Sequence, residues 1–347
     1  MRLKGVVYDV GRAMGALSVN WRPDYTPALL RRELDIIASD LHANAVRLGG
    51  RNPHRLLDAA EYAASIGLQV WMGPELWNAT PERTLAFVSD AAAAADPLFR
   101  RYPNQLTFCV GNEFTFLMRG IVPGRNHAQR AQAPNIRELI RSDQSALRRF
   151  LTDLAVSVRR VYSGPITYCA LPIERVDWEH FDIVAVNYYR QSRQGLTDEQ
   201  YLAKLQQLQA ADKPVVVSEF GFTSSRDADN PEHLSGFNAR PAALLPGIGK
   251  VIRPRVRTAY PRDEHTQARL LLGQLQLLEH ANVDGAFLMC FSFPLAPYSD
   301  DPRHDIDATS LSIVRSLPDG QRGTTYPDMA WEPKQAFHTV ASYYASR

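Results

Sequence analysis

Two glutamates stand where strand-like apolar runs of the sequence end. Glu113 closes LTFCVGNE (106–113), and Glu219 follows PVVVS within the run 214–222. A carboxylate at the end of a buried strand is costly unless it has a partner, so such a residue usually has a task. A carboxylic acid that donates a proton and a carboxylate that attacks carbon together form the pair that cleaves glycosidic bonds. We therefore take Glu113 and Glu219 as the candidate catalytic residues.

Other polar and aromatic side chains occupy the ends of further apolar runs or the loops that follow them. An arginine ends the second run, an asparagine precedes Glu113, and NYY ends the sixth run. Aromatic residues nearby are candidates for stacking on a sugar ring. The candidates for substrate binding or support at this level are Arg47, Trp77, Asn112, Trp178, Asn187, Tyr188, Tyr189 and Tyr298.

The elements that must position these residues alternate along the whole chain. Short apolar runs are separated by amphipathic helical stretches, which indicates a parallel α/β fold. Thr26-Pro27 and Thr80-Pro81 each combine an N-cap residue with a proline at the first helical position. The expected strands cover residues 5–11, 44–50, 68–74, 106–113, 165–172, 182–189, 214–222 and 285–294.

Eight strand–helix units with no leftover segment predict a single (β/α)8 barrel domain over residues 1–347, with long loops after strands four, seven and eight. A doubly wound open sheet would also alternate, but GVVYDVGRAMG lacks the G-x-G-x-x-G spacing of its phosphate loop. In a barrel the ends of strands four and seven face each other across the mouth. Their carboxyl groups can converge to about 5 Å, the separation used by retaining enzymes.

On these residues the chain resembles the clan-A glycoside hydrolases, which are retaining (β/α)8 enzymes. VGNEF matches their Asn-Glu motif at the end of strand four, and VVVSEFGF matches their nucleophile at the end of strand seven. The resemblance implies that Glu113 is the general acid/base and Glu219 the nucleophile. It also implies that Asn112 binds the 2-hydroxyl of the sugar.

Two further motifs are similar to those of the clan. AVRLGG supplies the arginine that many members carry late in strand two, here Arg47. DIVAVNYYR looks like the Asn-Tyr-Tyr run of family 1 members, in which the second tyrosine hydrogen-bonds the nucleophile, and this implies Tyr189. We expect Arg47 and Tyr189 to hold Glu219 ionised, and the nearby charge of Glu219 to keep Glu113 protonated at rest.

The sequence departs from the clan at strand eight. Clan-A enzymes usually end that strand with a tryptophan that forms the floor of the sugar site, but GAFLMCFSFP has none. Phe291 is the expected replacement, unless the site accepts an unusual sugar. The departure leaves the identity of the sugar open.

Composition gives little reason to expect other partners or chemistries. The net charge of +2 does not favour nucleic acid or membrane surfaces, and no run approaches the length of a membrane span. The N-terminus runs directly into a strand without an apolar signal region, so we expect a cytoplasmic protein. Cys109, Cys169 and Cys290 lie in apolar runs and are expected to be buried free thiols. The proposed chemistry needs no cofactor, and the oligomeric state stays open.

Two loops on the catalytic side are rich in arginine. One contains Arg119, Arg125 and Arg130, and the other Arg253, Arg255 and Arg257. Solvated loops in an arginine-biased composition are one explanation, and recognition of an anionic sugar, such as a uronic acid or a phosphorylated glycoside, is the other.

The leading interpretation is hydrolysis of a β-linked glycoside with net retention. Transglycosylation uses the same two glutamates, and the sequence cannot separate the two reactions. A catalytically inactive, carbohydrate-binding barrel is a third reading, disfavoured because binding alone has no need of a carboxylate pair. A metal-dependent barrel hydrolase is disfavoured by the absence of His-x-His ligands.

Overall fold

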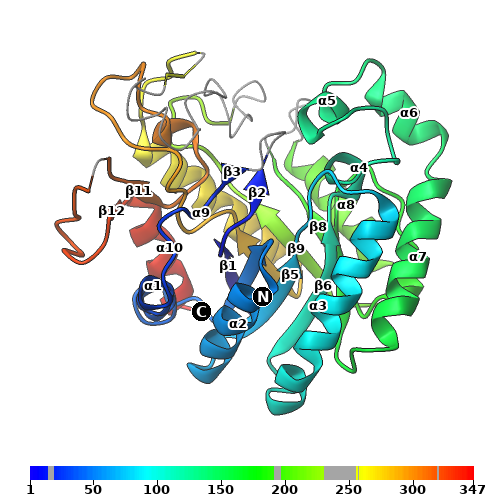
Figure 1. Cartoon of the computed structure of the whole chain (residues 1–347). Helices are drawn as coiled ribbons and strands as arrows, with labels where there is room; N and C mark the ends of the chain where they lie inside the picture. Colours follow the sequence, from blue (N-terminus) through cyan, green and yellow to red (C-terminus); the bar gives the residue numbers. More distant parts are fainter. Residues whose placement is uncertain (15–18, 191–196, 230–254, 257, 319) are drawn as a thin grey trace.

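Eight parallel strands close into a barrel in the computed structural model (Figure 1), so the predicted (β/α)8 fold is confirmed. The structure describes residues 1–14, 19–190, 197–229, 255–256, 258–318 and 320–347. Around the barrel each strand pairs with its sequence neighbour, and β1 also pairs with the last strand, which closes the sheet. The barrel strands are β1 (Leu3–Asp9), β4 (Ala45–Gly50), β5 (Gln69–Pro74), β6 (Leu106–Asn112), β7 (Ile166–Ala170), β8 (Ile183–Asn187), β9 (Val215–Phe220) and β10 (Gly285–Leu288).

Helices cover the outside of the barrel, and they begin where the sequence signals placed them. The side chains of Thr26 and Thr80 accept backbone N–H groups at the starts of α1 and α3, each of which has proline in its first turn. The principal helices are α1 (Pro27–Ser39), α2 (Pro53–Ser65), α3 (Pro81–Arg101), α7 (Ser145–Arg159), α8 (Asp198–Gln209), α9 (Glu264–His280) and α10 (Gln335–Ala345).

Between β7 and β8 the described chain forms only the 3-10 turn η1 (Trp178–His180), in keeping with the short segment that separates these two apolar runs in the sequence. One barrel strand differs from the sequence expectation. The last barrel strand stops at Leu288, not at residue 294. Beyond it the Cys290 N–H donates to Leu311 O, so the chain at Cys290 bonds to the segment that follows β10.

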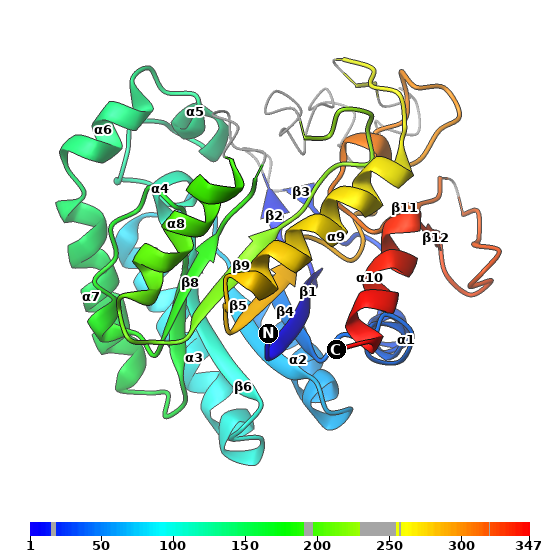
Figure 2. The same cartoon turned by 180° about the vertical axis from the view of Figure 1, so that it is seen from behind.

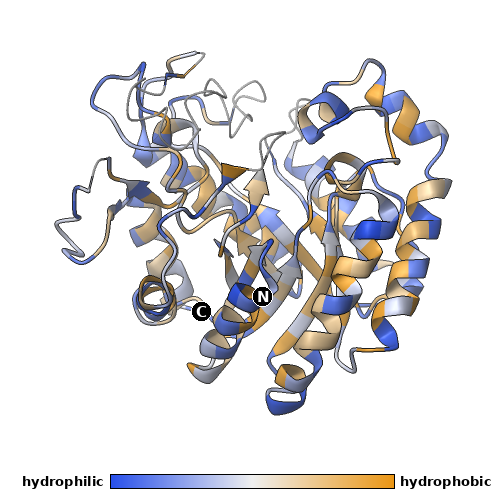
Figure 3. Ribbon diagram, viewed as in Figure 1, coloured by the Kyte–Doolittle hydropathy of each residue, from blue (hydrophilic) through white to orange (hydrophobic). Residues whose placement is uncertain are grey.

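The barrel has two separate apolar layers. Inside, Trp71 and the ring of Phe287 pack 4.9 Å apart, and Gly5 leaves room for that ring because a Cβ there would lie 2.3 Å from it. Outside, the buried faces of the helices pack on the outward side chains of the strands. Figure 3 shows hydrophobic and hydrophilic residues on the same helices, as expected for helices with one buried face.

Several smaller elements lie on the side of the barrel where the strands end, at the top of Figure 1. After β6 the stretch expected to be a loop contains three short helices. The small elements are β2 (Ala13–Met14), β3 (Val19–Asn20), α4 (Phe114–Leu117), α5 (His127–Ala131), α6 (Ile136–Ser142), η4 (Asp307–Thr309), β11 (Val314–Ser316) and β12 (Trp331–Pro333).

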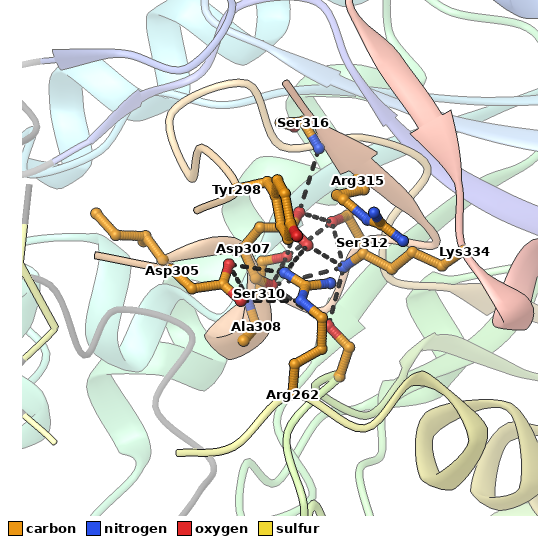
Figure 4. A network of polar contacts seen from close by, with 12 residues as sticks. Arg262, Tyr298, Asp305, Asp307, Ala308, Ser310, Ser312, Arg315, Ser316 and Lys334 are labelled. Carbon is orange, nitrogen blue, oxygen red and sulfur yellow. Dashed lines mark hydrogen bonds and ion pairs between the residues drawn. The ribbon is translucent and has the colours of Figure 1, made fainter. Parts of the chain in front are cut away.

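A buried ionic network anchors the long segment that follows β10 (Figure 4). Asp307 is fully buried and pairs with Lys334 at 2.8 Å and with Arg262 at 2.9 Å. Arg262 also reaches Asp305, at 2.7 Å. The network ties the segment that follows β10 to the start of α9 and the start of α10.

The two ends of the described chain lie close together at the amino end of the barrel (Figures 1 and 2). Lys4 Nζ donates to Tyr344 O over 2.8 Å, and Tyr344 Oη donates to Gly5 O over 3.1 Å. The three cysteines are buried and free. Among the described helices, none combines the length and the apolar character that crossing a lipid bilayer requires.

Candidate active site

Glu113 is the first residue beyond β6 and lies in a left-handed conformation, with φ 43° and ψ 47°. This turn aims the chain out of the strand and into α4, and it is held by a buried network. The Phe114 N–H donates to Tyr168 Oη at 2.7 Å, and the Thr115 N–H donates to Glu174 Oε1 at 3.0 Å. Tyr168 in turn donates to Glu174 Oε2 at 2.9 Å. Glu174 therefore fixes the backbone that carries Glu113.

Glu219 lies at the end of β9, and both of its carboxylate oxygens are held. Arg47 Nη1 contacts Oε1 at 2.7 Å, and Tyr189 Oη donates to Oε2 at 2.8 Å. Arg47 is only 2% exposed and Glu219 only 7%. A buried carboxylate with one guanidinium and one hydroxyl donor is stabilised in its ionised form.

Asn187 connects Glu113 to the strand that carries Glu219. Its Nδ2 donates to Glu113 Oε1 and to Asn112 Oδ1, both at 2.8 Å. Its Oδ1 accepts a hydrogen bond from Ser218 Oγ at 2.8 Å, and Asn187 is the register partner of Glu219 in the β8–β9 pair. The ends of strands β6, β8 and β9 are thus joined in one hydrogen-bonded group.

The two carboxyl groups have different electrostatic surroundings. Burial, the charge of Glu219 and the charge of Glu174 raise the pKa of Glu113 to about 8, against the hydrogen bond from Asn187. Burial and the adjacent Glu219 also raise the pKa of the Tyr189 phenol well above its usual range, which keeps it a neutral donor. At neutral pH the site therefore holds one protonated carboxylic acid and, beside it, a carboxylate stabilised by Arg47.

The sequence reasoning missed a buried charged group beside this pair. Arg12, which is 2% exposed, lies 2.9 Å from Glu75 and 3.5 Å from Asp9. Gly49 leaves space for the guanidinium, since a Cβ there would lie 2.2 Å from it. The charges of Arg47 and Glu219 also act on Arg12, so the group lies beside the Arg47–Glu219 pair. Its signal in the sequence was a charged residue shortly after each of the strands β1 and β5.

Aromatic rings extend from this charged group towards the mouth of the barrel. Trp77 donates through Nε1 to Glu75 at 2.9 Å and is half-buried. Its ring meets Trp21 edge to face at 5.7 Å, and Trp21 meets Phe293 in the same way at 4.9 Å. Among the aromatic residues expected to stack on a sugar ring, Trp77 is therefore the one whose position supports that role.

The residue at the end of strand eight is Met289, not the expected Phe291. Phe291 is fully buried and packs outside the barrel, with its ring 5.3 Å from that of Trp331. Met289 directly follows β10, is half-buried and packs on the cluster inside the barrel. The backbone of both residues stays beside the barrel, with Met289 N bonded to Phe220 O at 2.7 Å and Phe291 N to Val7 O at 3.0 Å, but the two side chains pack on opposite sides of the sheet.

Three other aromatic candidates lie away from the pair. Tyr188 stacks on Tyr201 of α8 with ring centroids 4.2 Å apart. Trp178 lies at the amino end of the barrel, where its carbonyl accepts from Lys213 at 2.6 Å. Tyr298 has two guanidinium groups over its ring, those of Arg262 and Arg315, at 4.9 and 4.8 Å (Figure 4). Among the described ring contacts, none joins these three residues to Glu113 or Glu219.

The arginine-rich loops divide into different environments. Arg130 is buried, whereas Arg119, Arg125 and Arg255 are exposed. Arg253 and Arg257 lie outside the described residues. In the described part of the chain no three metal-ligating side chains gather into a group that could hold a metal ion.

Comparison with known proteins finds likeness at the level of the fold. No protein-family model matches the sequence, and no curated protein matches it. A GH113 β-1,4-mannanase complex aligns over 99% of both chains with a TM-score of 0.57 and 14% identity. The GH113 β-mannanase AaManA from Alicyclobacillus acidocaldarius, in complex with ManMIm, aligns over 99% of this chain and 97% of its own with a TM-score of 0.55 and 17% identity.

A larger protein shares the same barrel. Bacteroides uniformis β-glucuronidase 2, covalently bound to cyclophellitol-6-carboxylate aziridine, aligns over 99% of this chain but 35% of its own length, with a TM-score of 0.56 and 15% identity. At these identities the likeness establishes the (β/α)8 fold.

Proposed function

We propose that the chain is a glycoside hydrolase that cleaves a β-glycosidic bond with net retention. The observation that carries the proposal is the asymmetric pair: Glu219 held by Arg47 and Tyr189, and Glu113 with its pKa raised to about 8. The substrate that we propose is a small carbohydrate or glycoside, and the exposed arginines around the mouth favour one that carries negative charge.

In the first step the Glu219 carboxylate attacks the anomeric carbon while Glu113 gives its proton to the departing glycosidic oxygen. The products are a glycosyl ester on Glu219, a free leaving-group alcohol and an ionised Glu113. In the second step Glu113 takes a proton from water, the water oxygen attacks the anomeric carbon, and the ester bond to Glu219 breaks. Two inversions give net retention.

Asn112 and Asn187 fit roles in orienting the sugar and the acid. Asn187 Nδ2 holds Glu113 Oε1, and Asn112 gives its Oδ1 to the same amide. In the described part of the chain, no residue accepts a hydrogen bond from Asn112 Nδ2, which leaves this group available to a sugar hydroxyl. A bond to the 2-hydroxyl strengthens as the oxocarbenium-like transition state forms.

The fold likeness supports the same chemistry. Two of the matching barrels are described as β-mannanases and one as a β-glucuronidase with a covalently bound aziridine. Transglycosylation, in which a sugar replaces water in the second step, would use the same residues. An inactive carbohydrate-binding barrel would not need a carboxyl group whose pKa is raised to about 8 beside a carboxylate held for attack.

A screen of aryl β-glycosides with neutral and charged sugars tests the proposal. We expect wild-type turnover on at least one aryl glycoside and a loss of at least about a thousandfold in Glu113→Gln and Glu219→Gln. A Glu113→Ala variant should recover activity with azide and release a glycosyl azide of retained configuration. Near-wild-type turnover in either glutamine variant would show that the residue is wrongly assigned.

A further inference from the structure

An arginine-lined hollow opens beside Trp77 on the face where the barrel strands end. Its volume is about 380 Å³, and it lies where the segments after β4, β5 and β6 meet. Backbone bonds from Asn78 N to Leu117 O (2.7 Å) and from Arg119 N to Ala79 O (2.9 Å) join two of these segments. The lining residues, which we call the arginine hollow, are Arg51, Leu76, Trp77, Asn78, Ala79, Arg83, Arg119, Arg125, Asn126 and Gln129.

The arginine hollow has positive charge without a matching carboxylate. Four arginines line it, all four are exposed, and its lining includes neither aspartate nor glutamate. Among the described residues none of the four guanidinium groups has a carboxylate within ion-pair distance, although most arginine side chains elsewhere on the barrel do.

A larger hollow elsewhere gives the contrast. It measures about 620 Å³ and lies between α1 and the segment that carries β11 and β12. Its lining contains carboxylates as well as arginines, for example Asp328, which pairs with Arg32 at 2.8 Å, and Glu33, which pairs with Arg22. Unbalanced charge is therefore a property of the arginine hollow and not of every concave surface on the molecule.

A fifth guanidinium lies behind the arginine hollow. Arg130 is fully buried, yet it bonds only to neutral oxygens: Phe116 O at 2.6 Å, Gly124 O at 3.2 Å and Asn78 Oδ1 at 2.6 Å. Burial, together with the charge of Arg119, lowers the pKa of Arg130 to about 10. The surroundings of Arg130 thus already disfavour positive charge, and a bound anion would offset that charge.

The arginine hollow is connected to the catalytic pair. Trp77, which lines it, bonds to Glu75, and Glu75 pairs with Arg12 beside Glu219. Arg51 follows β4, the strand that supplies Arg47 to Glu219. A ligand in the hollow would therefore continue from the site of bond cleavage along the Trp77 side of the mouth.

We propose that the arginine hollow binds a negatively charged sugar unit next to the unit that is cleaved. The planar guanidinium fork matches the paired oxygens of carboxylate and sulfate groups, and the Trp77 ring offers an apolar surface for the sugar itself. This inference rests on the proposed glycosidase function and specifies the substrate class of that site as an anionic glycan.

Calorimetric titration of the full chain tests the inference, in a Glu219→Gln background so that no probe is consumed. The probes are trigalacturonate, with carboxylates only; a carrageenan tetrasaccharide, with sulfates only; mannotetraose, which is neutral; and inorganic sulfate. We expect one or both charged oligosaccharides to bind at least about tenfold more tightly than mannotetraose, and this difference to shrink as salt is added. The comparison of the two charged probes identifies the anionic group.

Paired variants locate the binding. Arg83→Gln with Arg119→Gln should weaken binding of the charged oligosaccharide by about tenfold or more. Arg149→Gln with Arg160→Gln is the matched control, because it removes the same charge from exposed arginines of α7 and its C-cap and should leave binding unchanged.

Three results would overturn the inference: charged probes that bind no better than mannotetraose, equal binding by the two paired variants, or inorganic sulfate that binds as tightly as the sulfated tetrasaccharide. Failure here is separable from failure of the proposed function. Hydrolysis of an aryl glycoside by the wild type would uphold the proposed function even if no charged oligosaccharide bound to the arginine hollow.

Discussion

At the scale of single residues, the two glutamate side chains of the site, Glu113 and Glu219, have different surroundings. Glu219 receives a guanidinium on one oxygen and a phenol on the other, whereas Glu113 is held by the amide of Asn187 and faces two other carboxylates. One carboxyl group is therefore stabilised as an ion and the other as an acid. Double displacement needs this difference before substrate arrives.

Removal of the Tyr189 hydroxyl tests its role as a donor to Glu219. In Tyr189→Phe the Glu219 carboxylate loses one of its two donors, so it is less well oriented for attack. We expect kcat/KM to fall by about tenfold to a hundredfold, the range for a hydrogen bond to a charged group. Tyr188→Phe is the matched control, because Tyr188 packs on Tyr201 and should be dispensable for turnover. Equal losses in both variants would contradict the role given to Tyr189.

The charge coupling between the glutamates predicts a pH dependence. Glu113 must be protonated for the first step, so kcat/KM should fall as the pH rises through about 8. Because the charge of Glu219 raises this pKa, the Glu219→Gln variant should titrate Glu113 at a lower pH. Carbon NMR of labelled glutamate side chains measures the shift. An unchanged or higher pKa in that variant would refute the coupling.

At the residue scale the sequence predicted the positions of those side chains that depend only on where a strand lies. Asn112, Asn187 and Tyr189 join the candidate pair because each stands at or next to the carboxyl end of a barrel strand, whereas Arg47 reaches Glu219 from within β4. Phe291 and Tyr298 could not be placed, since each follows the end of β10 and its side-chain direction depends on a long loop. The Asp9–Arg12–Glu75 group depends on contacts between loops from different strands, which one sequence does not specify.

At the scale of elements, Glu113, the proposed acid/base, immediately precedes the short helix α4, and Glu174 from the segment after β7 anchors the first turn of that helix. Glu174 acts on Glu113 both through the backbone and through its charge, which raises the Glu113 pKa. It is a positioning residue, because it contacts the backbone of the turn and not the reacting atoms.

Replacing Glu174 separates these two effects. In Glu174→Gln the negative charge is lost, so the pKa of Glu113 should fall and the alkaline limb of the kcat/KM profile should move to lower pH. Glu179→Gln is the control, since Glu179 is an exposed carboxylate in η1 at the amino end of the barrel. If kcat fell at every pH while the alkaline limb of the kcat/KM profile stayed in place, Glu174 would have only a structural role.

The segment after β10 is held by the Asp307–Lys334–Arg262 network, which makes it a second test at this scale. Lys334→Met leaves the buried Asp307 carboxylate with one cation fewer, and we expect a loss of about 3 kcal/mol in the free energy of unfolding. The midpoint of urea unfolding measures it.

Arg303→Ala is the control, because its exposed pair with Asp301 should contribute little to stability. Equal unfolding midpoints in the two variants would contradict the anchoring role of the Asp307 network.

Element positions were predictable where caps and apolar periodicity agreed. Helices α1 and α3 begin at the predicted Thr-Pro signals. The segment LPIERVDWEH between β7 and β8 is too short to show helical periodicity, and the chain forms only the turn η1 there. The Lys213 side chain contacts the Trp178 carbonyl of this turn.

At the scale of the whole molecule, barrel closure turns residues far apart in sequence into neighbours. Arg47 and Glu219 are 172 positions apart, and they meet because β4 and β9 face the same interior. The alternation of strands and helices was sufficient to predict this closure, since eight parallel units satisfy every strand edge. The loops that shape the substrate site follow no such rule, which is why the sugar was not predictable from the sequence.

Covalent trapping tests the central claim most directly. The 2-deoxy-2-fluoro analogue of an aryl β-glycoside that the wild type turns over should inactivate the protein with a stoichiometry of one, and peptide mass spectrometry should locate the sugar on Glu219. Prior inactivation should block turnover, and Glu219→Gln should remain unlabelled. A label on any other residue, or turnover without an adduct and with an inverted product by proton NMR, would contradict the account.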